Sequence, residues 1–385
     1  MNVLRRLRYG RIHKLRQQRN ISWKVPKEKR NLQKSWITIK PETLLTVSDN
    51  ISSMDTEEII EIGDTDGVFF GGRQQKDTDL NHAKKATHPE NQYLDLISNI
   101  IKNGVEEDTR NGLTKSIIGA TMRFPLSNGQ IPLLTTKKLA WKSCLKELMW
   151  FISGDTNNKT LVNQNVKIWN DNASREFLDS RNLKHLGEGD LGPIYGYQWR
   201  FYNLSYIPLH IVPSANINKI RKSLNGGVDQ LENIIKCLED PEKRNSRRLI
   251  LTAWNPEQID QMALPPCHVM SQFSVLGNKL HCTMYQRSGD VGLGIPFNIA
   301  SYSFLTILLA KHCGLEPGEF IHFIGNAHIY KEHEEMLMEQ LKRRPKSFPT
   351  CEIINKKDNI DDYVFSDFRI NNYEYHPTIK MNMIV

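Results

Sequence analysis

The feature that most restricts how this chain folds is the segment Leu264–His268, which reads Leu-Pro-Pro-Cys-His. Two consecutive prolines fix two φ angles and exclude a helix, so the backbone leaves the pair in a set direction. The following residues, Val269–Val275, largely alternate between apolar and polar side chains, which predicts a strand. Cys267 is therefore held rigidly where a strand begins, either as a buried core residue or as a thiolate nucleophile.

Composition and cysteine usage limit the class of protein. No apolar run approaches the roughly 18 residues that a membrane-spanning helix needs, so we expect no membrane segment. The six cysteines form no CxxC pair and no zinc-ligand spacing, and no secretory signal is present. We therefore expect reduced thiols, no metal and a cytoplasmic protein.

Charge divides the chain into parts. Residues 1–30 contain eleven Lys or Arg and one acid, Glu28, so this segment has a net charge of +10. Because the whole chain has a net charge of +8, the remaining residues together have a net charge of −2. This basic tail is either disordered and solvated, or a mitochondrial or nuclear address, or an arm that binds nucleic acid. Residues 31–89 form a polar, acidic, linker-like extension, and we predict one folded domain over 90–385.

The folded part mixes helices and strands without a regular β–α–β alternation. Residue patterns predict helices over 90–104, 142–153, 228–238 and 300–312, and strands over 117–124, 131–134, 249–254, 279–285 and 321–324. Residues 292–298 are expected to form a loop. This order favours an α+β fold over a doubly wound parallel sheet.

Turns and strand ends carry arginines beside small polar residues: Arg110, Arg247, Arg248 and Arg287. A guanidinium offers two parallel donors and a permanent charge, which suits a phosphate group, although each arginine alone is equally a surface ion-pair partner. The pair Arg287-Ser288 ends the strand that follows the Cys267 strand. Positive charge there would hold a phosphate near the thiol and lower the thiol pKa.

Two other side chains each have a structural and a functional interpretation. Asn298 presents one acceptor and one donor side by side, which match the N3–H and C4=O edge of uracil and not that of cytosine. Taken alone, it is equally a turn residue. Glu147 lies in an apolar helix, where a carboxylate is usually on the surface; if it is buried, its pKa would rise and it could transfer protons.

Several motifs in order give the chain a resemblance to a known family. They are Gly189–Pro193, Met262–His268, Tyr285–Asp290, Leu293–Ala300 and His376–Lys380. From about residue 90 to residue 385, the chain resembles thymidylate synthases. The resemblance implies a large mixed β-sheet with surrounding helices, and it leaves the N-terminal extension 1–89 outside the family domain.

The resemblance implies a methyltransferase of nucleotide biosynthesis. It would convert dUMP to dTMP by reductive methylation with 5,10-methylenetetrahydrofolate, which leaves as dihydrofolate. Cys267 would add to C6 of the pyrimidine, and C5 would then attack the methylene carbon. The folate would be both one-carbon donor and reductant, no metal would be needed, and the enzyme would be a homodimer.

The resemblance also assigns roles to residues. The catalytic set would be Cys267, Glu147, Tyr195 and His268. The dUMP set would be Arg110, Gln286, Arg287, Ser288, Asp290, Asn298, His328 and Tyr330, with Arg247 and Arg248 donated by the other subunit. The folate set would be Lys137, Trp169, Asp290, Leu293, Gly294, Phe297 and Val385.

Three features depart from the family's pattern. The turn that carries Arg110 lacks the usual Thr/Gly-rich sequence, Asn326 stands where the family usually has Asp, and residues 201–226 contain extra length. None of them involves Cys267 or Asn298, so we expect the enzyme activity to be retained and only its tuning to differ.

Other functions are open to the same sequence. A dUMP hydroxymethylase would use the same fold and thiolate but let water replace hydride, whereas a dCMP enzyme should carry Asp at the position of Asn298. A protein of a different class would bind nucleic acid through the basic tail. Residues 1–89 are too few, and too irregular, for a fused dihydrofolate reductase, so we expect none.

Overall fold

The computed structural model describes residues 87–211, 214–224 and 226–384. The predictions for the basic tail 1–30, for 31–86 and for Val385 lie outside these described residues. Within the described ranges, no helix is long and apolar enough to cross a membrane. The same ranges contain no cluster of three His, Cys, Asp or Glu side chains suited to holding a metal ion.

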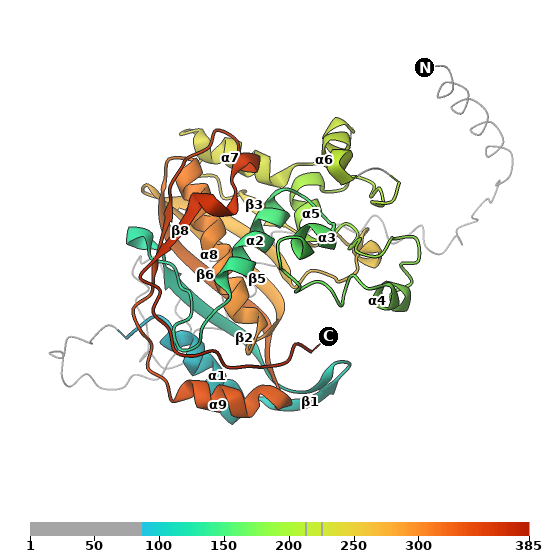
Figure 1. Ribbon diagram of the computed structural model, residues 1–385. Helices are drawn as coiled ribbons and strands as arrows, with labels where there is room; N and C mark the ends of the chain where they lie inside the picture. The colour runs from blue at the N-terminus through green and yellow to red at the C-terminus, as the bar shows by residue number, and fades with distance from the viewer. Residues whose placement is uncertain (1–86, 212–213, 225, 385) are drawn as a thin grey trace, which may run out of the picture. The chain divides into compact units, whose positions relative to one another are not determined.

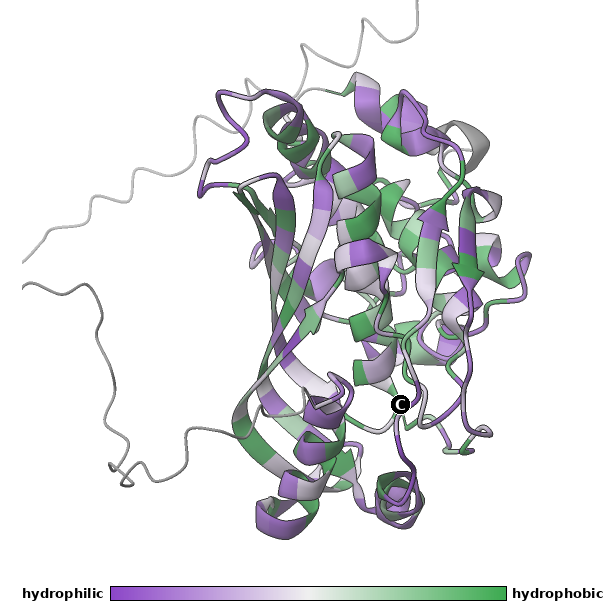
Figure 2. Cartoon of the chain, turned by 90° about the vertical axis from the view of Figure 1, so that its left-hand side faces the viewer, coloured by the Kyte–Doolittle hydropathy of each residue, from purple (hydrophilic) through white to green (hydrophobic). Residues whose placement is uncertain are grey.

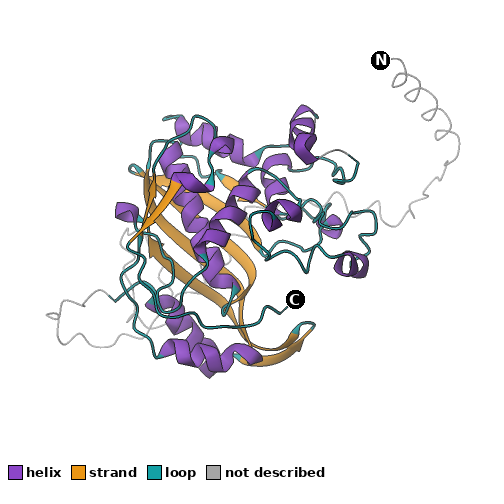
Figure 3. Cartoon of the chain, in the orientation of Figure 1, coloured by secondary structure: helices purple, strands orange, loops and turns teal. Residues whose placement is uncertain are grey.

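The described chain combines helices, strands and long loops (Figure 3). The helices are α1 Asn91–Asn103, α2 Trp141–Ile152, α3 Asn158–Val162, α4 Arg175–Ser180, α5 Tyr195–Phe201, α6 Ser214–Ser223, α7 Gln230–Glu239, α8 Gly294–His312 and α9 Glu334–Leu341. The strands are β1 Val105–Thr109, β2 Gly112–Pro125, β3 Ile250–Thr252, β4 His268–Leu276, β5 Lys279–Asp290, β6 Glu316–Tyr330, β7 Thr350–Ile353 and β8 Phe368–Asn371.

One mixed sheet organises the domain. Its strand order is β1-β2-β6-β5-β4-β3, and a separate pair is formed by β7 and β8. All neighbours in the large sheet are antiparallel except β5 and β6, which are parallel and are connected by α8. A single parallel crossover inside an otherwise antiparallel sheet confirms the predicted α+β class.

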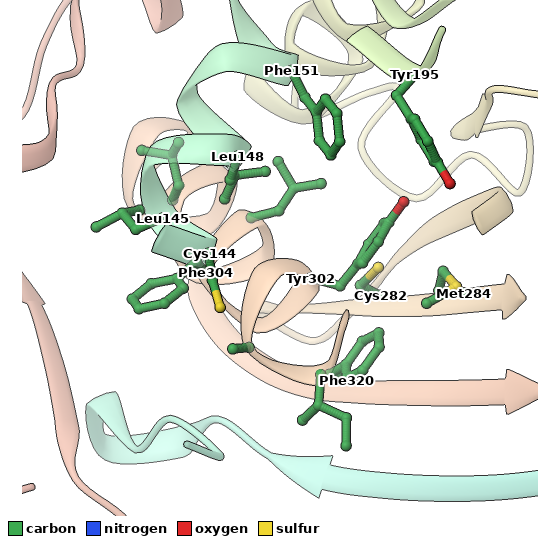
Figure 4. Close-up of a cluster of buried hydrophobic side chains, with 14 of the residues drawn as sticks. Cys144, Leu145, Leu148, Phe151, Tyr195, Cys282, Met284, Tyr302, Phe304 and Phe320 are labelled. Carbon is green, nitrogen blue, oxygen red and sulfur yellow. The ribbon is translucent and has the colours of Figure 1, made fainter. Parts of the chain in front are cut away.

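Helix α8 is the centre of the core. It is apolar on all sides, and a helix without a polar face must be covered everywhere. It lies between α2 and strands β5 and β6 (Figures 1 and 2). Leu148 of α2 and Phe304 of α8 lie in the same buried cluster as Met284 and Phe320 of the sheet (Figure 4).

The opposite face of the sheet carries exposed apolar side chains. Met270, Tyr285 and Phe323 are paired in register across β4, β5 and β6, so they lie side by side on one face. Tyr285 and Phe323 are 44% and 43% exposed. Exposed large apolar side chains that lie together on a sheet are typical of a protein interaction surface.

The extra length in 201–226 contains helix α6, which Arg221 fastens to the domain. The Arg221 side chain is fully buried, with its guanidinium carbon 4.8, 5.7 and 5.1 Å from the ring centres of Tyr197, Phe201 and Tyr206. A buried cation over aromatic rings is stabilised by their electron-rich faces. The insertion is therefore a docked element of the fold.

Two local predictions were wrong, and one predicted strand was too short. Residues 131–134 form no strand; they are a buried segment without regular secondary structure, in which Pro132 has no N–H to give to a ladder. Residues 292–298 are not one loop, because α8 begins at Gly294 with Pro296 in its first turn, where a missing N–H breaks no helical bond. The strand predicted over 321–324 is only the middle of β6.

Candidate active site

A cavity of about 420 Å³ lies where α2, α5 and α8 meet the ends of β5 and β6. It is lined by most of the residues to which the sequence assigned a role: Arg110, Glu147, Trp169, Tyr195, Cys267, His268, Gln286, Arg287, Ser288, Asp290, Gly294, Asn298, His328 and Tyr330. The whole predicted catalytic set is thus gathered at one cavity.

Cys267 sits at the cavity wall, immediately before β4. Its backbone is held on both sides, because its N–H donates to the Tyr195 hydroxyl at 2.8 Å and its carbonyl accepts from the Arg287 N–H at 2.9 Å. Burial raises the pKa of the Cys267 thiol, and the charge of Arg287 offsets only part of that rise, so the predicted lowering is not the net effect. The thiol is therefore placed rigidly, with the positive charge that favours its thiolate beside it.

Arg287 also fastens the proline pair. Its Nε donates to the Pro266 carbonyl and its terminal nitrogen to the Pro265 carbonyl, both at 3.0 Å. Because a guanidinium carries five donor hydrogens, these two bonds leave donors for an anion in the cavity. Ser288 follows on β5, and Arg110 reaches the same cavity from the β1–β2 turn.

Glu147 is half-buried and lines the cavity instead of the outer surface, which decides between the two interpretations of this residue. It accepts a hydrogen bond from the Trp169 indole Nε1 at 2.6 Å. Burial raises the pKa of Glu147 to about 7, and the Trp169 bond opposes that shift. A carboxyl group with this pKa can both donate and accept a proton near neutral pH.

His268 and Tyr195 stand beside this carboxyl. Their ring centres are 5.2 Å apart, and Tyr195 also lies 5.9 Å from the ring of Trp169. Burial lowers the pKa of His268 to about 4, so its imidazole is neutral near pH 7. The group of Glu147, Trp169, Tyr195 and His268 is polar, and it is uncharged when Glu147 is protonated.

Asn298 lies one turn after the start of α8, where it lines the cavity. Its Oδ1 accepts a hydrogen bond from Gln286 Nε2 at 3.0 Å. The amide nitrogen is therefore on the other side, and the acceptor and the donor of Asn298 have fixed places.

The end of β6 contributes His328 and Tyr330. Their rings are perpendicular, with centres 5.5 Å apart. His328 Nδ1 lies 3.1 Å from Asn326 Oδ1 and 3.5 Å from Ser288 Oγ. Burial lowers the pKa of His328, against the opposing charge of Asp290. A second cavity of about 320 Å³ shares both residues and Arg110, so the two cavities adjoin.

Some predicted residues do not reach the cavity. Arg247 and Arg248 are exposed just before β3, and neither lines it. Lys137 is buried, with its Nζ donating to the Gly292 carbonyl at 2.5 Å, and burial lowers its pKa to about 8. Leu293 and Phe297 also lie off the lining, and Val385 is outside the described residues.

Other residues line the cavity without having been predicted. They are Asn111, Phe151, Ile168, Asn172, Phe177, Leu264, Gly289, Met383 and Ile384. Phe151 stands one helical turn after Glu147, so the position of Glu147 could have indicated it. Met383 and Ile384 come from the chain's far end, and no local pattern indicates that such a segment returns to the site.

Comparison with known proteins agrees with this geometry. The family model described as thymidylate synthase matches residues 91–385. A protein named "Thymidylate synthase" from Homo sapiens is 48% identical over 299 residues, which cover 77% of this chain and 91% of the human protein.

Longer relatives have names that include a second activity. Proteins named "Bifunctional dihydrofolate reductase-thymidylate synthase" are 50% identical over 299 residues in Paramecium tetraurelia and 49% identical over 305 residues in Plasmodium chabaudi. These matches cover 77% and 79% of this chain, but only 62% and 50% of those proteins. The chain thus spans about half to two thirds of the bifunctional relatives. The resemblance seen in the motifs is confirmed, and the chain belongs to the thymidylate synthase family.

Proposed function

We propose that the protein is a thymidylate synthase, which methylates dUMP reductively with 5,10-methylenetetrahydrofolate to give dTMP and dihydrofolate. One observation carries the proposal: a rigidly held cysteine, an anion site, a half-buried carboxyl group and an oriented carboxamide line the same cavity. Family membership and a human relative of that name support it.

Cys267 is the proposed nucleophile. Its sulfur forms a bond to C6 of the uracil ring, and the C5–C6 double-bond electrons move toward C5 and O4. Arg287 favours the thiolate by its charge, while the bonds from the Cys267 backbone to Tyr195 and Arg287 keep the sulfur in place. Holding the reacting groups in position lowers the entropic part of the barrier.

Glu147 is the proposed proton-transfer group. When protonated, it stabilises the negative charge that develops at O4, directly or through water. When ionised, it accepts the proton that must leave C5 before the methyl group is complete. A pKa of about 7 makes both forms available near neutral pH. His268 and Tyr195 complete the same polar group without adding charge.

The rest of the cavity fits the nucleotide. Arg287, Ser288 and Arg110 supply donors for the phosphate, and His328 and Tyr330 supply groups for the ribose hydroxyl. Asn298 reads the uracil edge, with Gln286 fixing its direction.

The folate is a co-substrate that supplies the one-carbon unit and a hydride. Trp169, Gly294 and Asp290, with the unpredicted Met383 and Ile384, give the cavity a partly apolar wall suited to a flat ring. Lys137 does not line the cavity, and we propose that it supports the folate site indirectly. Its hydrogen bond to the Gly292 carbonyl fixes the loop between β5 and α8.

We also propose a homodimer that joins through the sheet face that carries Met270 and the exposed Tyr285 and Phe323. Arg247 and Arg248 are exposed and do not reach their own cavity, which suits donation to the phosphate site of a second subunit. An isologous interface of this kind would place each pair of arginines in the other subunit's site.

Product analysis tests the proposed reaction. The protein is incubated with dUMP and 5,10-methylenetetrahydrofolate, and nucleotide and folate products are separated. Equal amounts of dTMP and dihydrofolate are expected. Formation of 5-hydroxymethyl-dUMP without dihydrofolate would instead assign the chain to a dUMP hydroxymethylase.

A further inference from the structure

Base reading by Asn298 requires that its carboxamide be held in one orientation, because a 180° flip exchanges the positions of its donor and its acceptor. Uracil and cytosine differ in that same exchange. His268 lines the same cavity as Asn298, but an imidazole can supply either a donor or an acceptor, so it would not decide the direction. Gln286 decides it, because its Nε2 donates to Asn298 Oδ1 at 3.0 Å.

Gln286 is in turn oriented by two neighbours. Its Nε2 lies 3.0 Å from the Ser288 carbonyl oxygen, which can only accept, so the nitrogen end of Gln286 must be on that side. Its Oε1 then faces His322 Nε2 on β6, at 2.9 Å. An oxygen there can only accept, so His322 must carry its proton on Nε2.

Among the described residues, the His322 side chain makes no hydrogen bond other than the one to Gln286. It and Gln286 are 0% and 2% exposed, and His322 does not line the cavity. Its Nδ1 has no hydrogen-bond partner among the described residues. Burial and the nearby His268 lower the pKa of His322 to about 3, so the ring is neutral and has a single N–H to place.

We propose that His322 is a positioning residue that selects the pyrimidine base. Its Nε2–H holds Gln286 Oε1, Gln286 Nε2 holds Asn298 Oδ1, and the Asn298 carboxamide is thereby kept in the direction that accepts uracil and refuses cytosine. The proposal rests on the proposed function of the cavity. The adjacent parallel strands β5 and β6 bring His322 and Gln286 together (Figure 1).

A matched pair of variants tests the proposal. Met and Gln have similar shape, but only Gln supplies a donor near the position of His322 Nε2. Dissociation constants for dUMP and dCMP are measured calorimetrically on the full chain without folate. His322→Gln should keep the dUMP/dCMP preference of the unmodified protein, whereas His322→Met should reduce that preference about tenfold, because Gln286 Oε1 loses its partner. Equal preference in both variants would overturn the proposal.

A second measurement on the unmodified protein does not depend on how the variants fold. Nitrogen-15 spectra report which imidazole nitrogen carries hydrogen, and the spectrum of His322→Gln identifies the His322 signal. An Nε2–H tautomer is expected, and an Nδ1–H tautomer would refute the proposed chain of bonds. If the unmodified protein binds neither nucleotide, the proposed function fails, while the tautomer still decides whether the chain of bonds exists.

Discussion

Replacing Glu147 with Gln tests whether this carboxyl group is kept protonated by the fold. Burial raises the pKa of Glu147 from 4.5 to about 7. One pKa unit corresponds to about 1.4 kcal/mol, so ionising Glu147 in the folded protein costs about 3 kcal/mol relative to ionising it in the unfolded chain. Because the folded state binds the extra proton, this loss of stability grows as pH rises from 4.5 toward 7 and is complete above 7.

Gln cannot ionise, and its carbonyl can still accept the Trp169 hydrogen bond. Urea unfolding of the original protein and of Glu147→Gln, at equal protein concentration, is compared at about pH 5 and about pH 8. Because part of the loss has already occurred at pH 5, the stability of the variant relative to the original should increase by about 2.5 kcal/mol between those values. The control Glu257→Gln, at an exposed residue, should leave the difference between the two pH values unchanged.

The same variant should lose turnover by about 10²–10⁴-fold, because it removes the proposed proton-transfer group. A relative stability that does not change between the two pH values would show that Glu147 titrates like a solvated carboxyl group. That result would refute the argument from burial, whatever the effect on turnover.

Three further experiments test other parts of the site and fold. Asn298→Asp should shift binding from dUMP toward dCMP, because a carboxylate accepts from the cytosine amino group; an unchanged ratio of dissociation constants would count against base reading by Asn298. Mixing Cys267→Ala chains with Arg247→Ala chains should restore part of the activity that each lacks alone, and no recovery in a verified mixed dimer would exclude donation of Arg247 across the interface. Arg221→Met should lower the free energy of unfolding by about 2 kcal/mol, because the guanidinium loses its aromatic contacts; unfolding at the original urea concentration would contradict this.

The residues of the cavity were predictable where short motifs carry them. Cys267, Arg287 and Asn298 have side chains whose chemistry is specific, and each stands in a contiguous run of residues with restricted conformations. The pairing of His268 with Gln286 then brings the first two motifs together in adjacent strands. The location of Glu147 could be decided only from the structure. An apolar helix can place a carboxylate either inside or outside, and packing against Trp169 decides between the two.

Contacts that depend on strand order were not predictable. His322 lies in the strand parallel to that of Gln286, and nothing in either segment reveals this pairing. Strand β1 was missed because all its residues are exposed, so it shows no alternation between apolar and polar side chains. Residues 131–134 were mistaken for a strand because burial alone produces an apolar run, whether or not a neighbouring strand pairs with it.

The proposed role of Cys267 is tested most directly with dUMP that carries tritium at C5. Methylation at C5 must release that hydrogen to water, and in the proposed mechanism C5 becomes nucleophilic only after the Cys267 sulfur adds to C6. With 5,10-methylenetetrahydrofolate present, the unmodified protein should release one tritium for each dTMP formed. Cys267→Ala should release none, although it still binds dUMP. Tritium release by the Cys267→Ala protein would contradict the assignment of Cys267 as the nucleophile.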